Sequence, residues 1–60
     1  MKRYDIRFLN HAGSVFGRDE MRCACDDDVI EKARHLHRHG IGKGYEIWEE
    51  DRLVHTEIHR

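Results

Sequence analysis

The 60-residue sequence contains no proline, only two cysteines and no long apolar run. A membrane-spanning helix needs about 18 consecutive apolar residues, and no apolar run here exceeds three. Cys23 and Cys25 are two positions apart, so on a strand they would lie about 6.6 Å apart with parallel side chains, which excludes a disulfide between them. We therefore expect no membrane span and two reduced thiols.

The N-terminus begins with basic residues at positions 2 and 3 but has no apolar segment behind them. Secretory signals need such a segment, so we expect a cytoplasmic protein. Without proline and with only five glycines, the chain shows no linker. A chain of this length buries only about 60% of the surface that it exposes when unfolded. We therefore predict a single domain, residues 1–60, with one small core.

Neither sign of charge is in excess, because 11 lysines and arginines stand against 12 aspartates and glutamates. Nucleic-acid binding relies on a basic surface that neutralises phosphates, so this balance argues against nucleic acid as a partner. Histidine is abundant instead. Protonation of all six histidines would change the formal net charge from −1 to +5.

Arrangements that support catalysis are also missing from the sequence. Ser14 is the only serine, and it lies in a predicted turn with no buried acid to orient a histidine base. The glycine-rich stretch at residues 40–44 precedes a predicted strand and lacks the spacing of a phosphate-binding loop. So small a core leaves no room for a deep cleft either, and we predict a non-enzymatic protein.

Alternation of polar and apolar residues predicts four strands, at residues 4–9, 15–25, 45–49 and 53–58. Turn residues at positions 10–14 predict a hairpin between the first two strands, and Gly17 predicts a bulge in the second. The side chains expected to face inward are Tyr4, Ile6, Phe8, Met21, Cys23, Cys25, Tyr45, Ile47, Val54, Thr56 and Ile58.

One helix is predicted between the second and third strands. Asp28, with Glu31 three residues later, loosely fits a capping box and marks its start. We expect the helix to extend to about His39, with Gly40 as its C-cap. His37 lies at the border of the buried stripe, where its ring would pack over the sheet. The stripe itself consists of Val29, Ile30, Ala33 and Leu36.

These elements predict an α+β fold of ββαββ type, a four-stranded, mainly antiparallel sheet with one helix packed on one face. If all neighbouring strands are antiparallel, the strand order is 2-1-3-4. The order 1-2-3-4, with a parallel central pair, remains open at the level of sequence.

Core and turn motifs are spread over nearly the whole chain: Arg3-Tyr4, Phe8-Leu9, Gly13, Cys25-Asp26-Asp27-Asp28, Glu46-Ile47-Trp48 and Arg52-Leu53-Val54. In this arrangement the chain resembles a family of short, uncharacterised proteobacterial proteins. The resemblance implies the ββαββ layout and a cytoplasmic bacterial protein, and it implies no activity. The chain departs from the family pattern at Glu50, where the family often has glycine, and in its histidine-rich helix.

The predicted helix places histidines at a spacing that suits a metal ion. His35 and His39 lie four positions apart, with Glu31 one turn earlier. Two imidazoles and a carboxylate can bind Zn²⁺. However, this stripe lies opposite Ala33, in solvent, where no further group would orient the ligands. We predict a solvated helix face with no resident cofactor, and a zinc-binding module is the alternative.

The sheet face away from the helix has the composition of a protein interface, since tryptophan and arginine dominate binding hot spots. A second copy on this face would also compensate for the small core. The leading hypothesis is therefore a homodimer, and association with a different protein or weak nucleic-acid binding are alternatives. The residues expected to form the interface are Leu9, Trp48, Arg7, Arg22 and His55.

Overall fold

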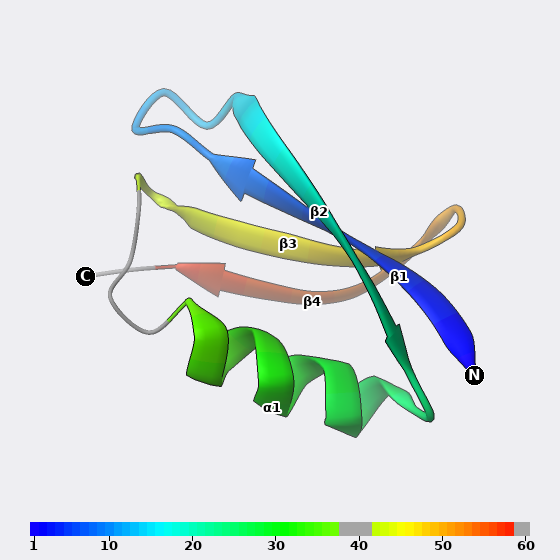
Figure 1. The fold of residues 1–60 in the computed structure, drawn as a ribbon. Helices are drawn as coiled ribbons and strands as arrows, with labels where there is room; N and C mark the ends of the chain where they lie inside the picture. The colour runs from blue at the N-terminus through cyan, green and yellow to red at the C-terminus, as the bar shows by residue number, and fades with distance from the viewer. Residues whose placement is uncertain (38–41, 59–60) are drawn as a thin grey trace.

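The computed structural model describes residues 1–37 and 42–58 (Figure 1). The described elements follow one another along the chain as β1 (Lys2–Leu9), β2 (Val15–Cys23), α1 (Asp26–Leu36), β3 (Gly44–Glu49) and β4 (Arg52–Ile58). The strands form one antiparallel sheet in the order β2-β1-β3-β4, and α1 lies along one face of it. The ββαββ prediction is confirmed, with the all-antiparallel strand order. We call the face toward α1 the inner face and the opposite one the outer face.

The helix begins three residues before its predicted start, since its N-cap is Cys25 and not Asp28. Its first turn consists of the aspartates at positions 26–28, whose negative charges interact favourably with the helix dipole. Cys25 is the N-cap and makes no side-chain capping hydrogen bond, so the capping box predicted at Asp28 is wrong. The helix ends at Leu36, three residues short of the prediction. Gly40, the predicted C-cap, lies outside the described residues.

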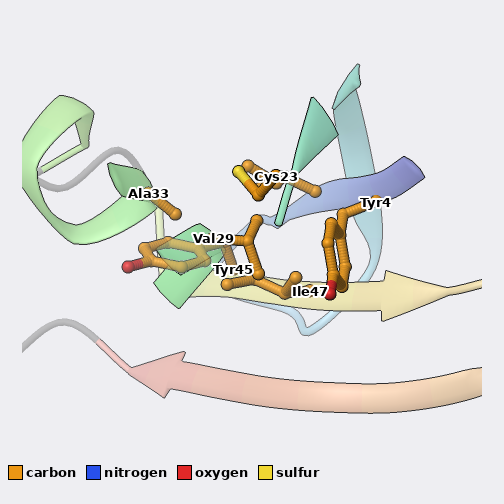
Figure 2. Close-up of a cluster of buried hydrophobic side chains, with 7 residues drawn as sticks. Tyr4, Cys23, Val29, Ala33, Tyr45 and Ile47 are labelled. Carbon is orange, nitrogen blue, oxygen red and sulfur yellow. The ribbon is translucent and has the colours of Figure 1, made fainter. Parts of the chain in front are cut away.

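The core lies between α1 and the inner face (Figure 2). Four predicted core positions are wrong. Leu36 is 61% exposed, Cys25 is exposed because β2 ends at Cys23, and Thr56 and Ile58 are exposed on β4. Most of the predicted inward positions are nevertheless confirmed. The fully buried side chains of the core cluster are Tyr4, Ile6, Cys23, Val29, Ala33, Tyr45 and Ile47, and those partly buried against them are Phe8, Met21, Ile30 and Val54.

A bulge interrupts β4. Trp48 pairs with Leu53 and Ile47 pairs with His55, so Val54 is the extra residue on β4. Directly opposed residues share a face, and one extra residue shifts the two-residue alternation of the strand. The side chains in the second half of β4 therefore lie on the opposite faces of the sheet from those predicted.

This shift in β4 corrects the predicted positions of four residues. His55 and Glu57 lie on the inner face, opposite buried residues of β3, although the outer face was expected for both. Thr56 and Ile58 are exposed on the outer face instead of buried. Val54 still packs against the core, as predicted.

β2 contains a bulge as well, one residue from its predicted position. Phe8 pairs with Gly17 and Leu9 pairs with Val15, so Phe16 is the extra residue. Because β2 and β4 are the outermost strands of the sheet, each edge is interrupted by a bulge.

The buried and exposed aliphatic side chains predict different costs of truncation. Ile47 is fully buried, whereas Leu36 is 61% exposed on the helix. We predict that Ile47→Ala lowers the free energy of unfolding by about 2–4 kcal/mol, and that Leu36→Ala changes it by less than about 0.5 kcal/mol. Urea unfolding of both variants, followed by circular dichroism, measures the difference. Equal losses would contradict the placement of Leu36 outside the core.

The turn between β3 and β4 predicts a stabilising substitution. Glu50 has a φ of 53°, in the left-handed region, which costs a residue with a Cβ about 1–2 kcal/mol and costs glycine almost nothing. We predict that Glu50→Gly raises the free energy of unfolding by about 0.5–1 kcal/mol, since the more flexible unfolded chain offsets part of the gain. Asp51 has no positive φ, so Asp51→Gly should lower the free energy of unfolding, because glycine makes the unfolded chain more flexible. Thermal unfolding distinguishes them, and shifts of the same sign would refute the prediction.

Candidate interaction surface

The structure places four of the five predicted interface residues on the outer face, and one of these four, Leu9, is buried there. Arg7, Arg22 and Trp48 alternate with inward-facing residues of β1, β2 and β3. His55 is a correction, because the bulge in β4 puts it on the inner face. Leu9 is a second correction, since its side chain is only 8% exposed and is no free anchor.

The segment that leads into β3 packs against the backbone of Leu9. The amide of Lys43 donates to the carbonyl oxygen of Leu9 at 2.9 Å. A Cβ on Gly42 would overlap the same oxygen, so only glycine lets the chain approach this closely. Alternation along β1 does not reveal this long-range contact with the backbone of Leu9.

Trp48 is the best-defined side chain of the outer face. The guanidinium carbon of Arg7 lies 4.7 Å from the centroid of the indole ring, a cation–π geometry. The indole Nε1 donates to Glu46 Oε1 at 3.2 Å. Leu53, directly opposite on β4, is 47% exposed. The indole is therefore held in place by its neighbours.

Charged residues of β1 and β2 form bands across the outer face. The strand register sets like charges directly opposite one another, and we call these pairs the charge bands: Arg3 with Arg22, Asp5 with Glu20, and Arg7 with Arg18. The order along the strands is basic, acidic, basic. Sequence inspection missed the bands, because they appear only once the register of the hairpin is known.

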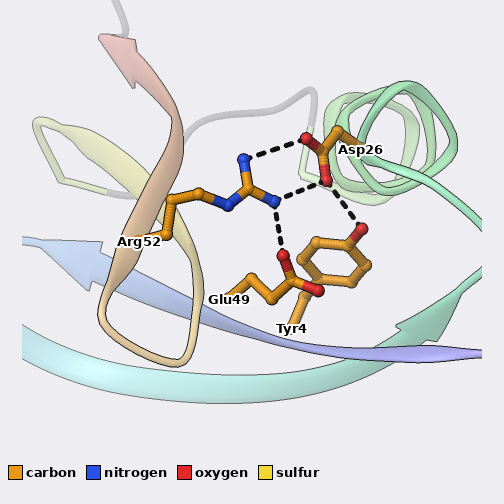
Figure 3. A network of polar contacts seen from close by, with 4 residues as sticks. All are labelled: Tyr4, Asp26, Glu49 and Arg52. Carbon is orange, nitrogen blue, oxygen red and sulfur yellow. Dashed lines mark hydrogen bonds and ion pairs between the residues drawn. The ribbon is translucent and has the colours of Figure 1, made fainter.

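A polar network on the inner face joins the helix to the sheet (Figure 3). Arg52 donates to both carboxylate oxygens of Asp26, at 3.0 and 3.1 Å, and to Glu49. The hydroxyl of Tyr4 donates to Asp26 Oδ1 at 2.8 Å. Sequence inspection missed this network as well, because Asp26 is 22 positions from Tyr4 and 26 from Arg52. Within the sequence, only the position of Asp26 beside the start of the predicted helix pointed to this network.

The network changes the pKa values of Asp26 and Tyr4. Hydrogen bonds from Arg52 and Tyr4 stabilise the charged form of Asp26 and lower its pKa. Burial, and then the hydrogen bond to Asp26, raise the pKa of Tyr4. Both residues thus keep a fixed protonation state near neutral pH, as suits a structural contact.

A smaller polar cluster lies at the other end of β4. Glu57 Oε1 is 3.1 Å from His55 Nε2 and 3.4 Å from Arg34 Nη2 on the helix. The hydrogen bond with His55 is the main cause of the lowered pKa of Glu57. His55 therefore pairs with Glu57 on the inner face and is not part of the predicted outer interface.

His37 packs over the sheet as predicted. Its ring centroid is 4.7 Å from that of Phe8 and 5.9 Å from that of Tyr45, both in edge-to-face geometry. The cysteines are both free. Burial raises the pKa of the Cys23 thiol, which opposes formation of a reactive thiolate.

The predicted metal ligands are only partly described. Glu31 and His35 are exposed and face solvent on α1, whereas His39 lies outside the described residues. Within residues 1–37 and 42–58, no three histidine, cysteine or carboxylate side chains are arranged to hold a metal ion. The geometry therefore adds no support to the zinc alternative.

No family model, curated protein or solved structure matches the chain. Membership of the short proteobacterial family that the sequence resembles therefore stays a prediction. In the described ranges, no helix has the length and apolar character that crossing a membrane requires.

The lowered pKa of Asp26 predicts a loss of stability in acid. A folded-state pKa below the unfolded value stabilises the protein above the unfolded pKa of about 4, and this contribution is lost as the pH falls through the folded pKa. We predict that the free energy of unfolding falls as the pH is lowered from about 5 to about 2. The fall should be less steep in Asp26→Asn, because asparagine has no carboxylate to protonate. Urea unfolding across this range measures both slopes.

Asp27→Asn is the matched control, because Asp27 is exposed in the same helical turn. This variant should keep the acid dependence of the wild type. An unchanged slope in Asp26→Asn would show that the Asp26 network does not contribute to acid sensitivity.

Proposed function

We propose that this protein acts by protein association, as a homodimer that forms through the outer face, and that it has no enzymatic activity. The observation that carries the proposal is Trp48, a tryptophan positioned by Arg7 and Glu46 on a sheet face that no described element covers. Tryptophan and arginine are the residue types most enriched at binding hot spots. A side chain that is already ordered loses little entropy when a partner binds.

Further exposed apolar side chains lie on the same face, one of them beside Trp48 and two at the Leu9 end of the sheet. Val15, Leu53 and Ile58 are 44–47% exposed, and each lies on the outer face through its pairing with the neighbouring strand. Their burial by a partner would be favourable, at about 25 cal/mol per Å² of apolar surface removed from water. This distribution supports an interface more than a ligand pocket.

We also propose the cytoplasm as the protein's location. The support is Cys25, an exposed free thiol, since exposed thiols stay reduced in compartments where disulfides are rare. A metal-binding role for Glu31, His35 and His39 is the second candidate, and no observation on the described residues favours it.

Truncation of the tryptophan tests the proposed interface. We predict a dimer for the wild type at about 100 μM and at least a tenfold weaker one for Trp48→Ala, the loss expected of about 1.4 kcal/mol or more at a hot spot. Light scattering coupled to size-exclusion chromatography reports the mass directly. Leu36→Ala, which removes an exposed apolar side chain from the helix, should dimerise as the wild type does. A monomeric wild type would refute self-association.

A further inference from the structure

The charge bands are unfavourable for an isolated sheet. Like charges directly opposite on neighbouring strands destabilise the pairing, yet three successive pairs of this kind lie between β1 and β2. Among the described residues, Arg3 and Glu20 form the only ion pair within the bands, at 3.4 Å, and both side chains are largely exposed. An exposed pair of this kind contributes little. Most of the charge on the bands is therefore available to a partner.

On β3, the residues beside the bands are Trp48 and Glu46, so the like-charged pairing stops at β1. Asp5, in the acidic band, pairs with Trp48, and Arg7, in the second basic band, pairs with Glu46. The boundary between these two bands therefore runs past the Trp48 centre. A partner that is centred on this boundary covers the tryptophan and both bands together.

We infer that a second copy of this chain docks on the outer face with antiparallel strands, related by a two-fold axis that crosses the strands between Asp5 and Arg7. This inference rests on the proposed self-association. In this arrangement Asp5 faces Arg7 of the second copy. Glu20 faces Arg18 of the second copy in the same way, and the symmetry creates each pair twice. The like-charged bands become opposite-charged contacts across the interface.

Other two-fold arrangements are less favourable. An axis parallel to the strands would place each band opposite the same band of the second copy. Like charges would then face one another across the interface, which is repulsive. An axis between the Arg3 band and the Asp5 band would pair charges but would leave the Leu9 end of the sheet uncovered. The charge bands thus specify both the direction and the register of the second copy.

The size of the face fits this partner. The molecule measures 32 by 23 Å in its two larger dimensions and 14 Å in the third. A face of the two larger dimensions approaches the roughly 800 Å² that each partner contributes to a standard stable interface. Two sheets stacked in this way cross at about 30°, so the charge pairs nearest the axis stay closest.

Charge exchange on β2 tests the inference. Arg18 and Glu20 are exposed, and reversal of either one forms an opposite-charged pair with β1 inside the chain. Glu20→Arg also removes the exposed ion pair with Arg3, which contributes little to the stability of the fold. We predict that Arg18→Glu and Glu20→Arg each weaken the dimer at least about tenfold, because each creates two like-charged contacts. The double variant Arg18→Glu/Glu20→Arg should return to within about threefold of the wild-type Kd. Sedimentation equilibrium at low salt gives the dissociation constants.

Asp19→Arg is the matched control, because it makes the same change in net charge as Glu20→Arg on the inner side of the same strand. It should leave the Kd unchanged, and a loss equal to that of Glu20→Arg would overturn the inference. A wild-type dimer whose single variants bind normally, or whose double variant stays as weak as the singles, overturns the register while self-association stands. A wild type that stays monomeric overturns both.

Discussion

Arg52 binds both carboxylate oxygens of Asp26, and this contact fixes the helix against the far strand of the sheet. Tyr4 binds the same carboxylate from β1, so one aspartate is shared by elements that are distant in sequence. Hydrophobic burial has no direction, and a core of a few side chains leaves the angle of the helix loosely determined. A bidentate ion pair with fixed geometry supplies the missing orientation.

The bulge at Val54 allows β4 to reach both ends of the helix from one face. Arg52, before the bulge, contacts Asp26 at the first turn, and Glu57, after it, contacts Arg34 near the last turn. These two positions are five apart, and regular alternation would place them on opposite faces of the sheet. The extra residue brings both onto the inner face and leaves Leu53 beside Trp48 on the outer face.

The order of elements was predictable because it follows from local patterns. Tyr45 and Ile47 alternate with polar residues, and Val29 and Ala33 recur at helical spacing, so each segment identifies its own buried side. The orientation of His55 was not predictable in this way, because the bulge depends on how β4 pairs with β3. The burial of Leu9 was missed as well, and the segment that contacts its backbone lies more than 30 positions away in the sequence. The charge bands likewise need the pairing register, which alternation along a single strand does not contain.

The bulges at Phe16 and Val54 also bear on solubility at high concentration. A flat, regular edge strand is a template for the addition of further strands, and uncontrolled growth from such edges leads to fibres. Here both edge strands are interrupted, and β2 carries a row of alternating charges beside its bulge. Growth by edge-to-edge strand pairing is therefore hindered at both ends of the sheet. In the proposed dimer, stacking of the outer faces ends once two copies have met, which would give a closed assembly in place of an open-ended one.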